Sequence, residues 1–482
     1  MKKSKIIRIL RSFDAAEQLR LTEFLHSPYC FQHPQEEKIQ QLLAYILEVL
    51  LDEQGAELSK EAAFHRLFPG EAMVKGKVEK LMTTLLQATH AFVLQEEHRR
   101  ASKTEQQLLL ANFFQRKGLD QDFHSSLQKA RKAQDQVKVK DRQHYHHSLR
   151  IEQVFAHYQG HYNPRHHHLN LLDTLHQLEW YYHIVKLEYS CMLVAQTCND
   201  ASLKDLVSED AISEMTQKIE QLELRQEPLT DAYLSALKLL RQQEESSFHQ
   251  LSQQLDQYDD SLPNDCRKSL SAVCRNFCVE QYNKGKTHYL DILHQLYQKH
   301  LAKGDLHHQG KLLASTFRNM VTMGLRLKKY DWVHQFLQEY RHRIGGTRQA
   351  EAIYKFNLAN YHFARHQYDE ALALLADKQQ DIYYRLAAKR LELKIHYELN
   401  SPLLAPRMDA FKVYIFRLSK KQLPDVPRQG NNHFVDVLRQ ICMPRTYRNN
   451  SRIDKLSDKL REKKILLEKD WLAEKLEALR QP

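Results

Sequence analysis

The feature that most constrains this chain is its shortage of glycine and proline. Its 482 residues include 12 of each, about 5% together against an average of roughly 12% for the pair. Both residues build the tight turns of β-hairpins and the phosphate-binding loops of doubly wound sheets. Their scarcity argues against sandwiches, barrels and doubly wound folds. Long runs of Leu, Gln, Lys, Glu and Ala are typical of helices, so the sequence predicts an all-α fold.

The overall balance of charged and apolar residues indicates a globular protein. Charged residues make up 27% of the chain and hydrophobic residues 42%, which excludes a disordered chain. No stretch approaches 18 consecutive apolar residues, so we expect no membrane span. The basic N-terminus resembles the start of a signal peptide, but Arg8 interrupts its apolar run and no small-residue cleavage site follows. Seven cysteines without a CxxC pair indicate buried thiols in a reducing compartment. We therefore expect a cytoplasmic protein.

Residues 1–100 are predicted to form an N-terminal helical module. The alternative for this module is a winged-helix-like fold. Apolar residues recur at helical spacing over 15–25 and 36–51. Ser59 is a plausible N-cap for a short helix that ends before Pro69-Gly70. The next helix carries one apolar stripe, formed by Val74, Val78, Leu81, Met82, Leu85, Leu86 and Phe92.

Residues 101–425 are predicted to form an array of helical hairpins. Breaks in the helical pattern are commonly 35 to 45 residues apart, the size of a two-helix repeat. The clearest unit is 350–375, where small Ala359 and Ala371 allow close helix packing and Tyr368 opens the second helix. This arrangement resembles a tetratricopeptide repeat. A degenerate copy 38 residues earlier carries Tyr330 and Val333 at the matching positions. Since such hairpins bury their apolar faces only by stacking, we expect a tetratricopeptide-like α-solenoid.

Residues 426–482 form a basic C-terminal segment. From Phe411 to Pro482 the chain carries 17 Lys/Arg against 9 Asp/Glu, and its first eleven residues add five further positive charges. The stretch from Asn449 to Arg480 is predicted to be one amphipathic helix, interrupted on its apolar stripe by Lys463 and Lys464. We interpret it as a capping helix that covers the last repeat.

Several short stretches suggest a family for the whole chain. They are FLHSPYC, HRLFPG, LKKYDWVHQFLQEY, YDEALALL and EKDWLAEKL. On these stretches the chain resembles a family of all-helical bacterial proteins, typical of the Bacteroidota, with degenerate tetratricopeptide-like repeats. The resemblance implies an N-terminal module, a helical array and a C-terminal helix, and it implies no activity.

The tripeptide Gly285-Lys286-Thr287 matches the end of a phosphate-binding loop. The full motif needs a second glycine at position 280, where this chain has Glu280. The surrounding residues have helical rather than strand-turn-helix character. We therefore expect a turn between two helices and no nucleotide cofactor.

Histidines gather between residues 143 and 168. His157 and His161 have the i, i+4 spacing of helical metal ligands. Gly160 and Pro164 argue against a regular helix there, and the adjacent His166–His168 cannot all face one ion. We predict a solvated polar face and no dedicated metal site.

Cys274 and Cys278 also have i, i+4 spacing, with Cys266 eight residues earlier. A structural zinc site needs two further ligands that the sequence does not place. The apolar residues around these cysteines favour burial in a core.

Residues 59–95 are similar in outline to a winged helix-turn-helix, a module that precedes tetratricopeptide-like repeats in some transcription activators. In this interpretation Lys75, Lys77 and Lys80 contact DNA phosphates. No clear β-wing follows Leu94, and the second helix lacks an Arg/Asn/Gln set for reading base edges. The alternative is a plain helical hairpin with solvated lysines.

No catalytic motif is present: the chain has neither a GxSxG elbow nor an HExxH pair. We expect a non-catalytic intracellular scaffold that binds another protein or a peptide, because stacked helical hairpins leave a curved surface for such partners. The alternative is a DNA-binding transcriptional regulator that uses residues 59–95, with the repeats as a sensor or partner-binding domain.

Overall fold

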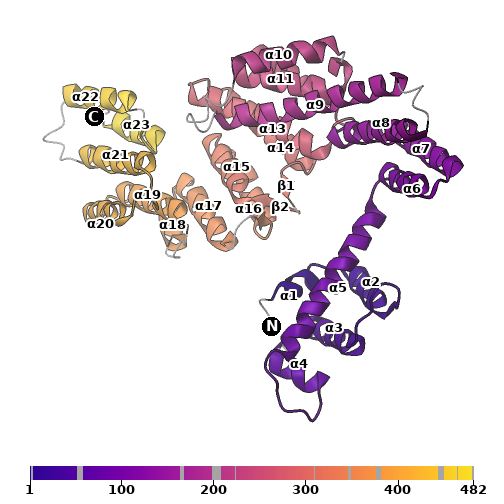
Figure 1. Ribbon diagram of the computed structural model, residues 1–482. Coiled ribbons are helices and arrows are strands. Elements are labelled where there is room, and N and C mark those ends of the chain that lie inside the picture. The colour runs from indigo at the N-terminus through magenta and orange to yellow at the C-terminus, as the bar shows by residue number, and fades with distance from the viewer. Residues whose placement is uncertain are drawn as a thin grey trace. The chain divides into compact units, whose positions relative to one another are not determined.

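The computed structural model describes residues 1, 4–51, 58–162, 168–197, 208–222, 224–308, 310–345, 349–375, 381–442, 450–463 and 465–479. Within these ranges the chain forms 23 α-helices, one short 3-10 helix and three strands of two or three residues (Figure 1). The all-α fold is therefore confirmed. No helix within the same ranges is both long and apolar enough to cross a membrane.

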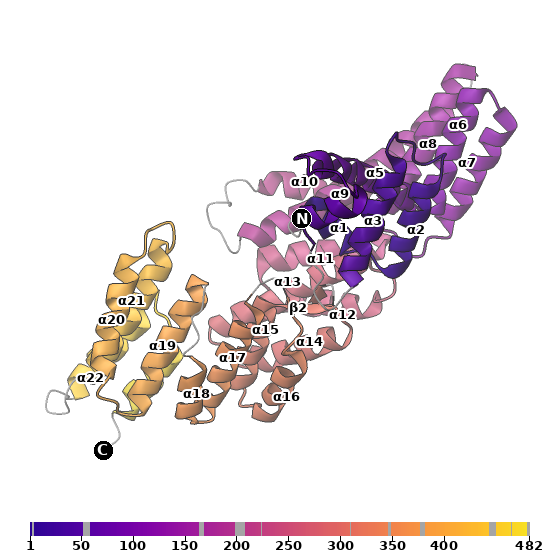
Figure 2. The ribbon, with the colours of Figure 1, turned by 90° about the horizontal axis from the view of Figure 1, so that it is seen from below.

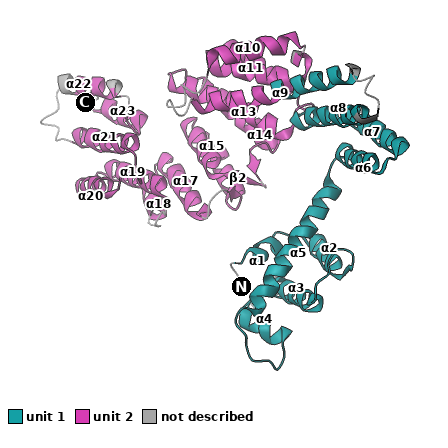
Figure 3. Ribbon diagram, viewed as in Figure 1, with its two compact units in different colours: residues 1–183 teal, residues 184–482 magenta. Residues whose placement is uncertain are grey.

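The chain divides into two compact units, residues 1–183 and 184–482 (Figure 3). The division falls inside the long helix α9 (His168–Thr197). The boundaries at residues 100 and 425 stay predictions. The other helices of the first unit are α1 (Lys5–Leu10), α2 (Ala15–His26), α3 (Glu36–Leu51), α4 (Lys60–Leu67), α5 (Lys77–Arg100), α6 (Lys103–Lys117), α7 (Asp120–Asp135) and α8 (Arg142–Tyr162).

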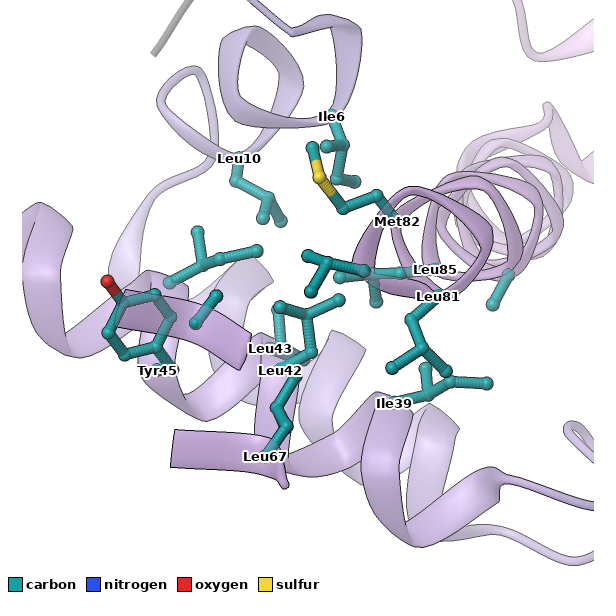
Figure 4. Packing of buried hydrophobic residues seen from close by; sticks show 14 of the residues in the cluster. Ile6, Leu10, Ile39, Leu42, Leu43, Tyr45, Leu67, Leu81, Met82 and Leu85 are labelled. Atoms are coloured by element: carbon teal, nitrogen blue, oxygen red, sulfur yellow. The ribbon is translucent and has the colours of Figure 1, made fainter. Parts of the chain in front are cut away.

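Helices α1–α5 share one hydrophobic core, in which side chains such as Leu10, Leu42, Leu67 and Leu85 point toward one another (Figure 4). Two helix starts are fixed by local capping. The Asp14 carboxylate accepts from the Glu17 amide at 2.7 Å, and the Glu17 carboxylate accepts from the Asp14 amide at 3.1 Å.

The predicted N-cap at Ser59 is confirmed, because its hydroxyl accepts from the Ala62 amide at 3.1 Å. The predicted apolar stripe is wrong at one position. Val74 lies before α5 begins and is 53% exposed, whereas Val78 is buried.

Helices α6, α7 and α8 pack around a second core in the first unit. The rings of Phe123 and Tyr158 stack there with centroids 4.1 Å apart. Gly118 ends α6 in the left-handed conformation at φ 69°, which allows α7 to fold back onto it.

The second unit consists mainly of consecutive helices that contact one another in pairs, and Figure 2 shows α19, α20 and α21 next to one another. Its further helices are α10 (Glu209–Gln221), α11 (Pro228–Gln242), α12 (Glu245–Gln257), α13 (Asn264–Asn283), α14 (Tyr289–Ala302), α15 (Ala314–Arg326), α16 (Tyr330–Tyr340), α17 (Ala350–Ala364), α18 (Tyr368–Leu374), α19 (Ile382–Glu398), α20 (Leu404–Arg417), α21 (Asp425–Ile441), α22 (Asn450–Glu462) and α23 (Lys469–Ala478).

The two repeat-like hairpins have the packing that their sequences predict. Ala359 of α17 and Ala371 of α18 are fully buried, and Tyr368 is the first residue of α18. In the earlier copy, Tyr330 opens α16, whose Val333 is fully buried. Consecutive hairpins also contact one another, but a continuous α-solenoid over 101–425 stays a prediction.

A small sheet that the sequence did not predict flanks the α15–α16 hairpin, with two strands before α15 and one strand after α16. Strand β1 (His307–His308) is antiparallel to β2 (Lys311–Leu313), and β2 is parallel to β3 (Ile344–Gly345). Its shortness explains why periodicity missed it: two or three residues show no alternation.

The C-terminal segment is two helices, so the prediction of one helix over 449–480 is wrong. Helix α22 ends at Glu462 and α23 begins at Lys469. Glu468, just before α23, adopts the left-handed conformation at φ 57°. The intervening Leu467 contacts the position of Gly430 in α21, so packing against α21 replaces the continuation of the helix.

Candidate functional site

The three lysines proposed to contact DNA have different surroundings. Lys75 and Lys80 are exposed, before and within the first turn of α5. Lys77 is half-buried: its ammonium lies 2.6 Å from the Glu71 carboxylate and 3.7 Å from the centroid of the Phe68 ring. One of the three charges is therefore already compensated within the module. For Lys75 and Lys80, no ion pair is recorded within the described ranges.

The rest of the winged-helix outline is incomplete. Helix α5 runs to Arg100 and α6 begins at Lys103, so helix occupies the segment after Leu94 where a β-wing would lie. Lys60 also pairs with Glu79 at 2.7 Å, and this hydrogen bond lowers the pKa of the Glu79 carboxyl. Lys60 and Lys77 are thus both paired with carboxylates, and a paired lysine attracts a phosphate less than an unpaired one does.

A groove on the surface of α2 and α3 is the most site-like feature of the N-terminal module. Its space is about 780 Å³ and opens to solvent. Buried Leu25 and Leu43 and half-buried Leu47 supply its apolar lining. Leu25 and Leu43 also belong to the hydrophobic core of the module, so they are held in fixed positions.

Polar side chains border this α2–α3 groove and are anchored by hydrogen bonds. The Gln40 amide donates to the Leu25 carbonyl at 2.9 Å, and His26 Nδ1 lies 2.8 Å from the Thr22 carbonyl oxygen. Exposed Glu37 adds a negative charge to the same border. An apolar floor with a polar border suits an amphipathic peptide.

Exposed leucines extend the apolar surface beyond the groove. Leu19 lies seven residues before His26 on the same face of α2 and is 61% exposed, and Leu51 lies seven residues after Ala44 on α3 and is 74% exposed.

The tripeptide Gly285-Lys286-Thr287 lies in the turn between α13 and α14, as predicted. Gly285 adopts a φ of 94°, a conformation that glycine enters without strain. A preceding strand is missing, since α13 is helical up to Asn283. The turn therefore lacks the strand-loop-helix context of a nucleotide site.

The predicted burial of Cys274 and Cys278 is confirmed. Burial raises the pKa of each thiol to about 12. Both side chains are therefore protonated at neutral pH, and a thiolate is the form that binds zinc or attacks an electrophile.

Helix α8 continues through Gly160 to Tyr162, so the expectation that Gly160 and Pro164 interrupt the helix around His157 is wrong. An interior glycine costs a helix only about 1 kcal/mol, and position 164 follows the end of α8. The side chains at 161 and 166–168 lie outside the described residues. Among the side chains that are described, no three His, Cys, Asp or Glu converge as metal ligands.

Sequence reasoning missed a charged cluster that joins α12, α13 and α14. Arg267 lies 2.9 Å from Asp259 and 2.7 Å from Asp305, whose side chain is only 2% exposed. Arg275 donates to His300 Nδ1 at 2.7 Å, and burial together with the charge of Arg275 lowers the pKa of His300 to about 3.

The imidazole of His300 is therefore neutral, with Nδ1 as acceptor because a guanidinium only donates. The acidic and basic side chains of this cluster form ion pairs and hydrogen bonds with one another. The arrangement joins the three helices through the ion pairs of Arg267 and the hydrogen bond between Arg275 and His300.

A second buried network joins α23 to α19. Glu468 lies 2.9 Å from Lys394 and 3.3 Å from Arg390, and Arg390 also donates to Asn431 of α21 at 2.7 Å. The Trp471 indole donates to Glu398 at 2.9 Å. These residues are separated by up to 78 positions in the sequence, so no local sequence pattern predicts the network.

Comparison with protein-family models, curated proteins and solved structures finds no match. The resemblance to the Bacteroidota family therefore stays a prediction, and the site is interpreted from its own geometry alone.

Proposed function

We propose that this chain is an interaction scaffold that binds an amphipathic helical segment of another protein in the α2–α3 groove. The observation that supports the proposal is a preformed apolar groove whose floor belongs to a packed core. Helix-in-groove recognition uses apolar anchors at i, i+3 or i+4, and i+7. The side chains that line the groove, from Thr22 of α2 to Leu47 of α3, offer the matching surface. The negative charge of Glu37 favours a ligand with a basic residue beside its apolar anchors.

The same proposal places the protein in the cytoplasm of a bacterial cell and assigns it no catalytic step. Support for a reducing compartment comes from the buried thiols of Cys191, Cys274 and Cys278.

Photocrosslinking from the groove tests the proposal. A benzoylphenylalanine at exposed Ala44 captures the partner in cells, mass spectrometry identifies the crosslinked segment, and a synthetic peptide of that segment is titrated against the purified chain. We expect the A44R substitution to weaken peptide binding by about tenfold or more, because it fills the groove with a charged side chain. The matched control is A91R, at an exposed position of α5.

Equal peptide binding by wild type and A44R overturns the proposal, as does a crosslinked segment whose peptide does not bind. Titration with random duplex DNA at about 50 and 200 mM salt tests the alternative. Tight binding that falls steeply with salt, and that K75E and K80E abolish, supports a DNA-binding regulator instead.

A further inference from the structure

The junction between α20 and α21, residues 413–426, presents apolar side chains to solvent and is called the α20–α21 tip below. Phe416, in the last turn of α20, is 85% exposed, and Val413 three residues earlier is 47% exposed. Side chains three positions apart lie on the same face of a helix. The other side of α20 carries Phe411 and Ile415, which are buried in the core of this part of the chain. Phe416 and Val413 are therefore not part of that core.

Positive charges accompany these apolar side chains. Arg417 directly follows Phe416, and Lys420 and Lys421 lie in the loop after α20; all three are exposed. Lys420 lies 3.5 Å from the carboxylate of exposed Asp425. For Arg417 and Lys421, no ion pair is recorded within the described ranges. The tip thus carries three exposed cations against one carboxylate.

A buried anchor holds the tip against the rest of the fold. Helices α20 and α21 pack side by side (Figure 2). The Arg428 guanidinium donates to the carbonyl oxygens of Ile415 and Leu418, both at 2.6 Å. These bonds join the first turn of α21, with exposed Val426, to the end of α20. Ile415 is buried, so the adjacent Phe416 is held pointing away from the core.

A tight turn places the two lysines at the surface. The Gln422 amide donates to the Ser419 carbonyl at 3.1 Å, and the Ser419 amide donates to the Gln422 side-chain oxygen at 3.0 Å. Lys420 and Lys421 are the central residues of this turn. Their backbone is ordered before any partner arrives, which lowers the entropy that binding costs.

The mixture of apolar and basic side chains indicates the partner. Anionic headgroups attract lysine and arginine, and apolar side chains beside them insert at the boundary with the acyl chains. Aliphatic Val413 beside Phe416 favours lipid over a nucleic acid, since bases stack on planar rings. We propose that the tip binds the surface of an anionic phospholipid membrane, with Phe416 inserted at the interface. The contact is peripheral and involves no membrane span.

Flotation of the purified full chain with vesicles tests the proposal. Vesicles of phosphatidylcholine with about 30% phosphatidylglycerol are compared with vesicles of phosphatidylcholine alone, at about 50 and 200 mM salt. We expect the protein to float with the anionic vesicles at the lower salt. Binding should be weaker by about tenfold or more at the higher salt and to the neutral vesicles, because salt screens the cations and neutral headgroups do not attract them.

Two variants separate the apolar from the electrostatic contribution. F416S should weaken binding to the anionic vesicles by about tenfold or more, because the inserted ring is lost. K420E/K421E should weaken it by about 100-fold or more, since four units of charge are reversed and each contributes about a factor of five near such a surface. Circular dichroism verifies that each variant retains its helix content.

Matched controls make the same changes outside the tip. Tyr29, between α2 and α3, is 98% exposed, and Lys129 and Lys132 are exposed on α7. Y29S and K129E/K132E should bind the vesicles within about threefold of the wild type. A44R should do the same, so this proposal and the proposed peptide groove can fail independently.

F416W reports insertion directly. Lipids with brominated acyl chains should quench its fluorescence more strongly than that of the wild type, whose three tryptophans lie outside the tip. A wild type that does not float with anionic vesicles overturns the proposal, as does equal flotation of wild type, F416S and K420E/K421E. Binding of a single-stranded oligonucleotide of about 20 nucleotides that F416S abolishes, without vesicle binding, identifies a nucleic-acid surface instead.

Discussion

Replacing Glu468 by glutamine removes the charge that joins the C-terminal helix α23 to α19. The Glu468 carboxylate sits between Lys394 at 2.9 Å and Arg390 at 3.3 Å, whose side chains are 11% and 9% exposed. Without it, two buried cations lose their shared partner. Glutamine keeps the size of the side chain and meets the same steric cost in the left-handed conformation of residue 468, so the substitution isolates the charge.

The expected magnitude follows from the pKa of Glu468. Burial alone raises this pKa, but the charges of Lys394 and Arg390 outweigh burial and hold it at about 2, against 4.5 for an ordinary glutamate. The carboxylate therefore stabilises the folded state fully above pH 4.5, and this contribution is lost as the pH falls toward 2. The pKa difference corresponds to about 3 kcal/mol. Since the side chain retains 29% exposure, we expect a loss of about 2–3 kcal/mol at pH 7.

Hydrogen–deuterium exchange with mass spectrometry measures this loss where it occurs. Peptides that cover α23 should exchange about 30- to 150-fold faster in E468Q than in wild type. The matched control is E474Q, whose side chain is 69% exposed and pairs only with Lys475 among its recorded ion pairs. We expect less than about a fivefold change for that variant.

A pH series provides a second, independent test. After correction for the intrinsic exchange rate, lowering the pH from about 7 to 3 should accelerate exchange of α23 in the wild type and leave E468Q nearly unchanged. Equal exchange rates of the α23 peptides in E468Q and E474Q at neutral pH would refute the reasoning.

Three further predictions concern the second unit. G324A should lower the free energy of unfolding by about 1–2 kcal/mol in urea, because the added Cβ would lie 2.5 Å from Val333 Cγ2 and outweigh the gain in helix propensity. R267M should cost about 3–5 kcal/mol by leaving the buried carboxylate of Asp305 unpaired, and R267M/D305L should recover most of it; an additive double variant would contradict this. Iodoacetamide at pH 8 should modify Cys274 only after unfolding, as peptide mapping would reveal, because burial raises the pKa of its thiol to about 12.

The helical character of the chain could be predicted because its signals are local. The caps at Asp14 and Ser59 act within three residues, and the buried positions of α3 follow a helical period that is visible in the sequence. The hairpin of α17 and α18 was likewise predicted from the small residues Ala359 and Ala371.

The candidate sites depended on contacts between distant residues. The compensation of Lys77 by Glu71 and Phe68 arises only once the connection before α5 has folded against α4. The break before α23 is decided by packing of Leu467 against Gly430 and by the ion pairs of Glu468. Along the chain, periodicity and capping determine which segments become helices, since both act over a few residues. Which faces become covered, and which charges meet, depends on chain segments brought together by packing, and only the tertiary structure decides that.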